Sequence, residues 1–187
     1  GSVVPLFHRQ IAAGGPVTLT DPEMTRFVMS IEQAVTLVVE SAAIARGGEV
    51  FITKMPVARI QDLAEIMIDT MAPLYGHEPN DVTIDIIGTQ PGEKLYEELM
   101  SQEEMRRAVE LPDYFSVLPA FRGIYRSIEY DYDEVLSEHV TNPYNSANEP
   151  SMTRAQLKEF LESKQLLAPG RFPTDLPAVR YWPGDRL

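Results

Sequence analysis

Arg26 is the residue whose type and position most favour binding chemistry. It stands between a turn and an apolar, strand-like run, and a helix start follows where Ser30 and Gln33 have the spacing of a reciprocal capping box. A guanidinium fixed by short elements on both sides offers paired donors to a phosphate and stays charged at any working pH. On local pattern alone a simpler interpretation is favoured, a surface arginine paired with Glu23 or Glu32.

The charge balance restricts the partners that such a cation can serve. The chain of 187 residues has a formal net charge of −12, which repels nucleic acid and anionic lipid because their binding depends on neutralising phosphates. We therefore expect no nucleic-acid partner. A small anionic ligand is compatible with this charge, since a few cations can gather locally around it, and the candidates are Arg9, Arg26, Lys54 and Lys94.

The elements that must position these side chains alternate between short strands and helices. Helical spacing of apolar residues predicts helices over residues 3–11, 31–45, 60–74 and 93–109, and after a second capping box at Thr153 and Gln156. Alternating patterns predict strands over 16–20, 49–53, 82–87 and 125–132, and a proline-bounded edge segment over 112–119. The pattern indicates an α/β fold, or α+β for the chain in isolation, with short strands and several packed helices.

The predicted helix over residues 31–45 has a broad apolar face. The face consists of Ala34, Val35, Val38, Val39 and Ala42. A continuous apolar stripe on one side of a helix ordinarily faces the interior of its domain. We therefore expect this face to lie in the core.

Motifs for an independent active site are absent from the sequence. There is no cysteine, so thiolate catalysis and cysteine metal sites are excluded. Neither a glycine-rich dinucleotide fingerprint nor a Tyr-x-x-x-Lys motif occurs, and the separated His8, His77 and His139 favour loop or surface positions over a metal site. We predict no catalytic, cofactor-binding or metal-binding residue, and no membrane segment, because no apolar run approaches the roughly 20 residues that a spanning helix needs.

Three blocks of the sequence together resemble a known family. They are Gly1-Ser2-Val3-Val4-Pro5-Leu6-Phe7, Thr20-Asp21-Pro22-Glu23-Met24-Thr25-Arg26-Phe27 and Pro91-Gly92-Glu93-Lys94-Leu95-Tyr96-Glu97-Glu98. In this order they are similar to the C-terminal part of the nucleotide-sugar 4,6-dehydratases, CapD-like polysaccharide biosynthesis proteins of the extended short-chain dehydrogenase/reductase superfamily. The group includes the UDP-N-acetylglucosamine 4,6-dehydratases.

The resemblance implies the domain organisation. Residues 1–167 would form the nucleotide-sugar-binding, C-terminal part of an extended Rossmann-type enzyme, and residues 168–187 a proline-rich C-terminal tail. We expect a parent protein with an N-terminal Rossmann domain, because the chain starts within the first of the three blocks. Val35, Val38 and Phe51 are then candidates for an apolar surface that packs against that domain.

The resemblance also implies the substrate-binding residues. Arg26 would be the leading ligand of the diphosphate, supported by Lys94 and Gln90. Relatives commonly have arginine where this chain has Gln90, and a neutral amide brings hydrogen bonds but no charge. The remaining predicted contacts surround the base or shape the turn, and they are Val4, Pro5, Phe7, Asp21 and Thr25. Glu93 is expected to stabilise the turn and not to act as a catalytic acid.

For the parent, the resemblance implies a cytoplasmic, homo-oligomeric lyase that uses NAD(P) and a UDP-sugar such as UDP-N-acetylglucosamine. NAD(P) would oxidise C4 of the hexose, water would leave across C5 and C6, and the hydride would return to C6. This chain alone would bind no cofactor and would not be active. Two alternatives stay open: part of a UDP-sugar epimerase of the same superfamily, and a non-catalytic interaction domain, which Gln90 favours.

Overall fold

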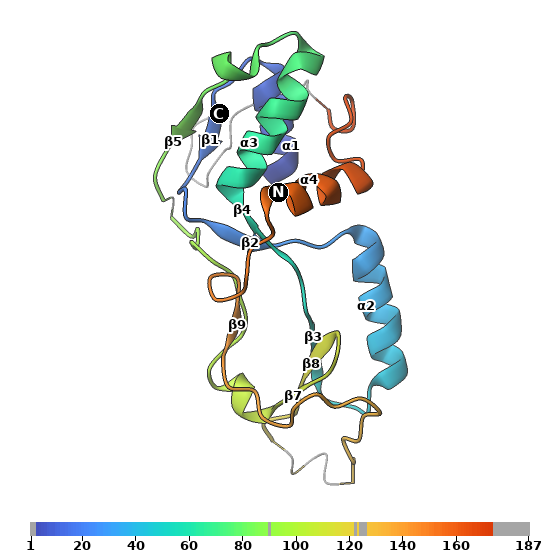
Figure 1. Cartoon of the computed structure of the whole chain (residues 1–187). Helices are drawn as coiled ribbons and strands as arrows, with labels where there is room; N and C mark the ends of the chain where they lie inside the picture. The colour runs from blue at the N-terminus through green and yellow to red at the C-terminus, as the bar shows by residue number, and fades with distance from the viewer. Residues whose placement is uncertain (1–2, 90, 122, 124–126, 174–187) are drawn as a thin grey trace. The chain divides into compact units, whose positions relative to one another are not determined.

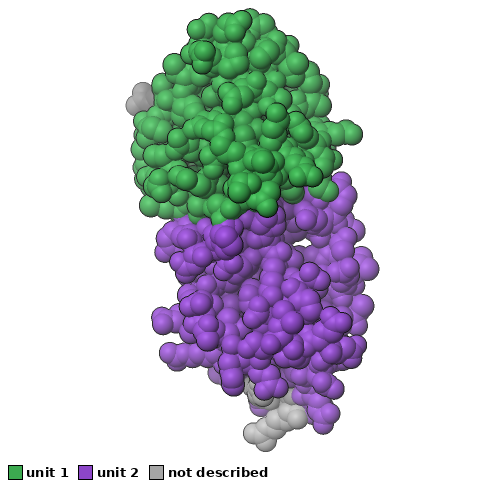
Figure 2. Space-filling model, in the orientation of Figure 1, with its two compact units in different colours: residues 1–26, 58–95, 151–187 green, residues 27–57, 96–150 purple. Residues whose placement is uncertain are grey.

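The computed structural model describes residues 3–89, 91–121, 123 and 127–173. Within this part the chain forms two compact units, which Figure 2 shows in different colours. Unit 1 contains residues 1–26, 58–95 and 151–187, and unit 2 contains residues 27–57 and 96–150. Residues 174–187 are not described, so the predicted division into residues 1–167 and a tail of 168–187 stays a prediction.

Unit 1 consists of helices packed beside a pair of short strands (Figure 1). Its elements are α1 (Val3–Ala12), β1 (Val17–Leu19), α3 (Ile60–Met71), the 3-10 turns η1 (Ala72–Tyr75) and η2 (Pro79–Asp81), β5 (Ile84–Ile86) and α4 (Arg154–Ser163). Both α1 and α4 pack against α3. The fully buried side chains of this unit include Phe7, Ile11, Leu19, Met67, Met71, Leu157 and Leu161.

Strands β1 and β5 of unit 1 are parallel. Val17 lies opposite Ile84 and Leu19 opposite Ile86, and the amide of Ile87 extends the ladder by donating to the carbonyl of Leu19 at 2.9 Å. Parallel pairing brings the carboxyl ends of both strands to the same edge. The described segments that follow, residues 20–26 after β1 and residues 87–89 and 91–95 after β5, therefore leave the sheet side by side.

Unit 2 is built around short antiparallel strands. Its elements are α2 (Ile31–Ile44), β3 (Val50–Thr53), β6 (Glu98–Met100), the 3-10 turn η3 (Glu104–Arg107), β7 (Ala108–Glu110), β8 (Tyr114–Val117) and β9 (Tyr144–Asn145). One sheet has the order β3-β8-β7, and β6 pairs with β9. Strands β2 (Thr25–Phe27) and β4 (Val57–Arg59), most of whose residues belong to unit 1, form a further two-stranded sheet.

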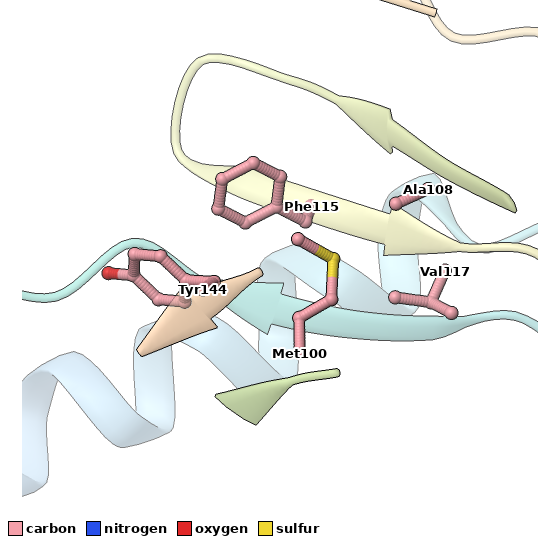
Figure 3. Packing of buried hydrophobic residues seen from close by; sticks show 5 residues of the cluster. All are labelled: Met100, Ala108, Phe115, Val117 and Tyr144. Carbon is pink, nitrogen blue, oxygen red and sulfur yellow. The ribbon is translucent and has the colours of Figure 1, made fainter. Parts of the chain in front are cut away.

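Two apolar clusters hold unit 2 together. Figure 3 shows the side chains of the first cluster, Met100, Ala108, Phe115, Val117 and Tyr144. The second cluster contains Leu111, Tyr114 and Tyr132, against which Leu37 and Ile44 of α2 pack. Each unit thus has buried apolar residues of its own.

The predicted α/β fold class is confirmed, and so are most of the helices and strands in the first half of the chain. The helices expected over 3–11, 31–45 and 60–74 form as α1, α2 and α3 with η1, and the strands expected over 16–20, 49–53 and 82–87 form as β1, β3 and β5. Both capping boxes are present, at Ser30 with Gln33 and at Thr153 with Gln156. These features depend on local signals, which the sequence displays directly.

The helix predicted over residues 93–109 is wrong. This stretch forms β6, η3 and the start of β7, in which Met100 and Ala108 are buried. Strand β6 pairs with β9, more than forty positions away, and β7 pairs with the nearby β8, so strand pairing overrides a helix propensity that is a weak local preference.

Two strand predictions in the second half of the chain also need correction. Residues 112–119 do not form an edge strand, because β8 is the central strand of its sheet and all four of its residues are buried. Its flanking prolines, Pro112 and Pro119, lie outside the ladder and leave every backbone donor of β8 available. No strand forms over 127–132, and residues 125 and 126 of that prediction lie outside the described part of the chain.

The predicted core face of α2 is wrong as well. None of its residues is buried, and the side chains of Val35, Val38 and Val39 are 58%, 65% and 64% exposed. The side that faces the unit 2 core instead includes Leu37 and Ile44.

Candidate functional site

The candidate site in unit 1 is formed by the two segments that leave the carboxyl ends of β1 and β5. Residues 20–26 follow β1, and residues 87–95 follow β5. Ligands of open α/β sheets commonly bind outside the carboxyl ends of the strands, where the connecting loops supply the polar groups. The candidate ligands Asp21, Arg26 and Lys94 all belong to these two segments.

The side chain of Arg26 joins the two segments. Its Nη2 donates to the carbonyl oxygen of Lys94 at 2.6 Å, and its Nη1 donates to the carbonyl oxygens of Thr25 at 2.7 Å and Leu95 at 3.2 Å. The amide of Thr25 also donates to the carbonyl oxygen of Leu95 at 3.0 Å. The guanidinium is therefore held beside the backbone that carries Lys94, and it places a fixed positive charge there.

A hydrogen bond between two side chains also connects the same two segments. The buried hydroxyl of Thr20 donates to Oε2 of Glu93 at 2.7 Å. Next to Glu93, Gly92 has a φ of +85°, a backbone conformation that glycine adopts at the least cost. This geometry agrees with a turn-stabilising role for Glu93.

Asp21 stabilises the turn after β1. Its Oδ1 accepts a hydrogen bond of 2.7 Å from the amide of Glu23, which is the pattern of an Asx turn. The carboxylate thereby shapes the segment that leads to Arg26.

The other residues predicted to contact the substrate lie in α1 or outside the described part of the chain. Val4 and Pro5 are half-buried. Phe7 has no exposed surface and packs in the core, so it can support Val4 and Pro5 but cannot contact a ligand itself. Gln90 lies outside the described residues. Contact of α1 with a base, and of Gln90 with a diphosphate, therefore stays a prediction.

A pocket of about 500 Å³ lies in unit 2, and none of the residues that the resemblance assigns to the substrate lines it. Lys54, Glu110, Phe115, His139 and Tyr144 are among its lining residues. The Nζ atom of Lys54 lies 2.7 Å from Oε1 of Glu110 and 5.1 Å from the centre of the Phe115 ring. The sequence indicated only Lys54 here, as a cation at a strand end.

Tyr144 lines this pocket, and two hydrogen bonds hold its hydroxyl group in place. The hydroxyl accepts a hydrogen bond of 2.7 Å from the amide of Met55 and donates one of 3.2 Å to the carbonyl oxygen of the same residue. Burial raises the pKa of the Tyr144 hydroxyl, so it remains protonated at neutral pH. The pocket thus combines aromatic surface with an ion pair.

The prediction that all three histidines occupy loop or surface positions is wrong for His8. This residue lies within α1 and is fully buried, with Nε2 at 2.7 Å from the carbonyl oxygen of Leu166. Burial lowers the pKa of His8. No group of three or more potential metal ligands occurs among the described residues.

A dinucleotide cofactor does not fit the geometry of the described elements. Its pyrophosphate needs a glycine-rich turn between a strand and the start of a helix. Helix α3 follows β4 without an intervening residue, and the three residues between β2 and α2 include no glycine. We therefore assign no described residue to NAD(P).

Comparison with known proteins identifies similar chains of about twice this length. An uncharacterised membrane protein of Methanocaldococcus jannaschii is 46% identical over 162 residues, and the match covers 87% of this chain and 45% of that protein. A UDP-glucose 4-epimerase of Rickettsia canadensis is 35% identical over 161 residues, with 86% and 45% covered. In the part of this chain that the structure describes, no helix has the length and apolar character needed to cross a membrane.

A solved structure and a family model also match this chain. The X-ray structure of Pen from Bacillus thuringiensis has a TM-score of 0.75 and 38% identity, and the match covers 89% of this chain and 46% of Pen. Each match therefore covers less than half the length of the other protein. The family model described as polysaccharide biosynthesis protein matches residues 1–119. This match shows that the chain belongs to the polysaccharide biosynthesis protein family.

Proposed function

We propose that this chain is the UDP-sugar-binding part of an NAD(P)-dependent nucleotide-sugar enzyme of polysaccharide biosynthesis. The observation that carries the proposal is the position of Arg26, which links the two segments at the carboxyl ends of β1 and β5. Its guanidinium supplies a fixed positive charge at the edge of a parallel strand pair, where a diphosphate is readily accommodated. The polysaccharide biosynthesis family and the similarity to a UDP-glucose 4-epimerase support a ligand of this class.

Arg26 and Lys94 would have different roles at this site. The Arg26 guanidinium is held by three carbonyl oxygens, so its contribution is a charge in a fixed place. Lys94 is exposed at the adjacent position of the second segment, and its flexible ammonium can follow a phosphate oxygen. Val4 and Pro5, half-buried on α1, remain the candidates for contact with the base.

The reaction of the whole enzyme is proposed as 4,6-dehydration, with 4-epimerisation as the alternative. NAD(P), when bound elsewhere in the parent, would accept the hydride from C4 in either reaction. The two differ in product, because dehydration yields a 4-keto-6-deoxy sugar and epimerisation a sugar of unchanged mass. Incubation of the parent enzyme with UDP-N-acetylglucosamine and NAD(P), followed by mass spectrometry, separates them: a loss of one water supports dehydration, and an isomer supports epimerisation.

Calorimetric titration of the chain with UDP and UDP-N-acetylglucosamine tests the binding proposal directly. Wild-type chain is expected to bind saturably, and both Arg26→Lys and Lys94→Ala are expected to weaken binding, more strongly at low salt because exposed charges are screened. Lys158→Ala, on an exposed face of α4, is the matched control and is expected to bind as wild type. Loss of binding in Lys54→Ala alone would transfer the site to the unit 2 pocket and contradict the assignment.

A non-catalytic interaction domain is the second candidate. The observation that favours it is that the Arg26 guanidinium already donates to three backbone carbonyl oxygens, which is sufficient reason for an arginine at this position. Absence of saturable heat with UDP at millimolar concentration, for a chain whose folding is verified by circular dichroism, would support this candidate over the first.

A further inference from the structure

The pocket of unit 2 is pre-formed, because backbone hydrogen bonds fix the segments that line it. The amide of Lys54, which follows β3, donates to the carbonyl oxygen of Asp113 at 2.9 Å. The amide of Glu110, at the end of β7, donates to the carbonyl oxygen of Ser137 at 2.8 Å, and this bond holds the segment that leads to His139. A pocket of about 500 Å³ lies within the size range of small-molecule sites. The pocket therefore has the size and the fixed walls of a ligand site.

With His139 neutral, the side chains that line this pocket carry one more negative than positive charge. Lys54 is the cation among the lining residues, and its Nζ lies 2.7 Å from Oε1 of Glu110, so these two charges neutralise one another. Glu149 is a second carboxylate in the lining and is half-buried. None of the ion pairs among the described residues includes Glu149. Its charge therefore has no counter-charge in the described part of the chain.

The carboxylate of Glu149 lies close enough to the Tyr144 hydroxyl to influence its ionisation. Burial is the main cause of the raised pKa of Tyr144, and the negative charge of Glu149 raises this pKa further. A partly buried charge loses hydration, and this loss is costly unless an opposite charge compensates for it. A ligand cation would supply that compensation, because opposite charges attract more strongly where water is partly excluded. Glu149 is thus the group of this pocket that most favours a bound cation.

We propose that the unit 2 pocket binds a small organic ligand through a primary ammonium group that pairs with the Glu149 carboxylate. The formal charge of −12 produces a field that attracts cations and repels anions. The hydroxyl of Thr141 and the amide of Asn142, also in the lining, can hydrogen-bond polar groups on the rest of the ligand. The proposal does not depend on the proposed UDP-sugar site, and its test contains no nucleotide.

An anion and a metal ion are poorer occupants of this pocket. An anion would compete with Glu110 for Lys54, and it would also meet the uncompensated charge of Glu149. A metal ion lacks a ligand set, since no group of three or more potential metal ligands occurs among the described residues. An ammonium group requires less, because one carboxylate gives it a charge-assisted hydrogen bond.

Calorimetric titration of the full 187-residue chain at low salt tests the proposal with two amines and their neutral counterparts. Putrescine is compared with butanediol, and glucosamine with glucose, so that an alkyl amine and a hydroxylated amine are both represented. At least one amine is expected to bind saturably at one site per chain. It should bind at least about tenfold more tightly than its neutral counterpart, which lacks the charge-assisted hydrogen bond. The tighter amine shows which carbon skeleton the pocket prefers.

Two substitutions in the pocket are expected to change amine binding in opposite directions. Glu149→Gln keeps the size of the side chain but removes its charge, so it should weaken binding of the amine by more than about tenfold. Lys54→Met removes the cation and leaves the charge of Glu110 uncompensated, so it should strengthen binding several-fold. Substitutions that merely damaged the pocket would both weaken binding.

The matched control removes the same charge outside the pocket. Glu159→Gln changes an exposed position of α4 in unit 1 and should leave the dissociation constant of the amine unchanged. Circular dichroism should show that all three variants are folded. The proposal is overturned if neither amine binds more tightly than its neutral counterpart, or if Lys54→Met weakens binding. It is also overturned if Glu149→Gln and Glu159→Gln weaken binding equally, because the amine then responds only to the overall charge.

Discussion

The hydroxyl of Thr20 donates a 2.7 Å hydrogen bond to the carboxylate of Glu93, although 73 positions separate them in the chain. The bond ties the segment after β1 to the segment after β5, and Arg26 makes a second tie between them through the carbonyl oxygens of Lys94 and Leu95. The candidate site is therefore a pair of cross-linked loops. Its geometry depends on links within unit 1 that can be removed one at a time.

Removal of the Thr20 hydroxyl is expected to destabilise the chain measurably. Thr20 is 7% exposed, and Thr20→Val retains its shape while leaving the Glu93 carboxylate without this donor. The free energy of unfolding should fall by about 1.5–3 kcal/mol, the range for a lost hydrogen bond to a charged group. Urea unfolding checks this value, and Thr36→Val on the exposed side of α2 is the control. An equal, small effect of both substitutions would contradict the proposed link.

The two capping boxes are expected to differ in their effect on global stability. Ser30→Ala and Thr153→Ala each remove a side-chain acceptor at a helix start, a change that costs about 1 kcal/mol of helix stability. Helix α4 buries Leu157 and Leu161, whereas α2 buries no residue completely. Thr153→Ala should therefore lower the urea midpoint of unit 1, and Ser30→Ala should mainly increase amide hydrogen exchange in α2. The reverse order of effects would contradict this assignment.

Local signals explain which elements the sequence predicts correctly. Helix α1, strand β1 and the two capping boxes depend on residues within a few positions of one another, so their pattern is visible in the chain. Strand β6 is held by a partner that local spacing does not reveal, because it pairs with β9, more than forty positions away. The stretch over 93–109 has residues that suit a helix, but only strand pairing buries Met100 and Ala108.

The same difference between local and long-range information applies to the candidate site. The family resemblance, and not local spacing, assigns Arg26 and Lys94 to one site. In the structure their segments meet because β1 and β5 pair in parallel. The pocket in unit 2 depends on Lys54, Glu110 and Tyr144, which come from three separate segments of the chain. No spacing rule joins these residues. The burial of His8 likewise depends on the distant carbonyl of Leu166.

The ion pair of the unit 2 pocket is expected to contribute modestly to stability. The side chains of Lys54 and Glu110 are 28% and 32% exposed, and the Lys54 ammonium also lies over the Phe115 ring. A double-mutant cycle of Lys54→Met and Glu110→Gln should give a coupling free energy of about 1 kcal/mol or less, since partial exposure screens the charges. The coupling should decrease further in high salt. A cycle on the exposed pair Lys158 and Glu162 is the control and should give a smaller value.

Burial of His8 should make the stability of unit 1 depend on pH. Burial lowers the pKa of His8 below its ordinary value of 6.5, because the charged imidazolium loses its hydration inside the unit. Between the lowered pKa of the folded state and 6.5, the unfolded state binds more protons than the folded state, so the free energy of unfolding rises with pH. The stability contributed by neutral His8 is complete above the unfolded pKa and is lost as pH falls through this window.

The substitution His8→Leu isolates this contribution. The variant loses the hydrogen bond to the carbonyl of Leu166 and should be less stable by about 1 kcal/mol at neutral pH. Its loss of stability on acidification should nevertheless be smaller than that of wild type, because it has no imidazole to protonate. Urea unfolding at about pH 7.5 and about pH 5 measures both slopes. Equal slopes for wild type and His8→Leu would show that another group causes the acid sensitivity.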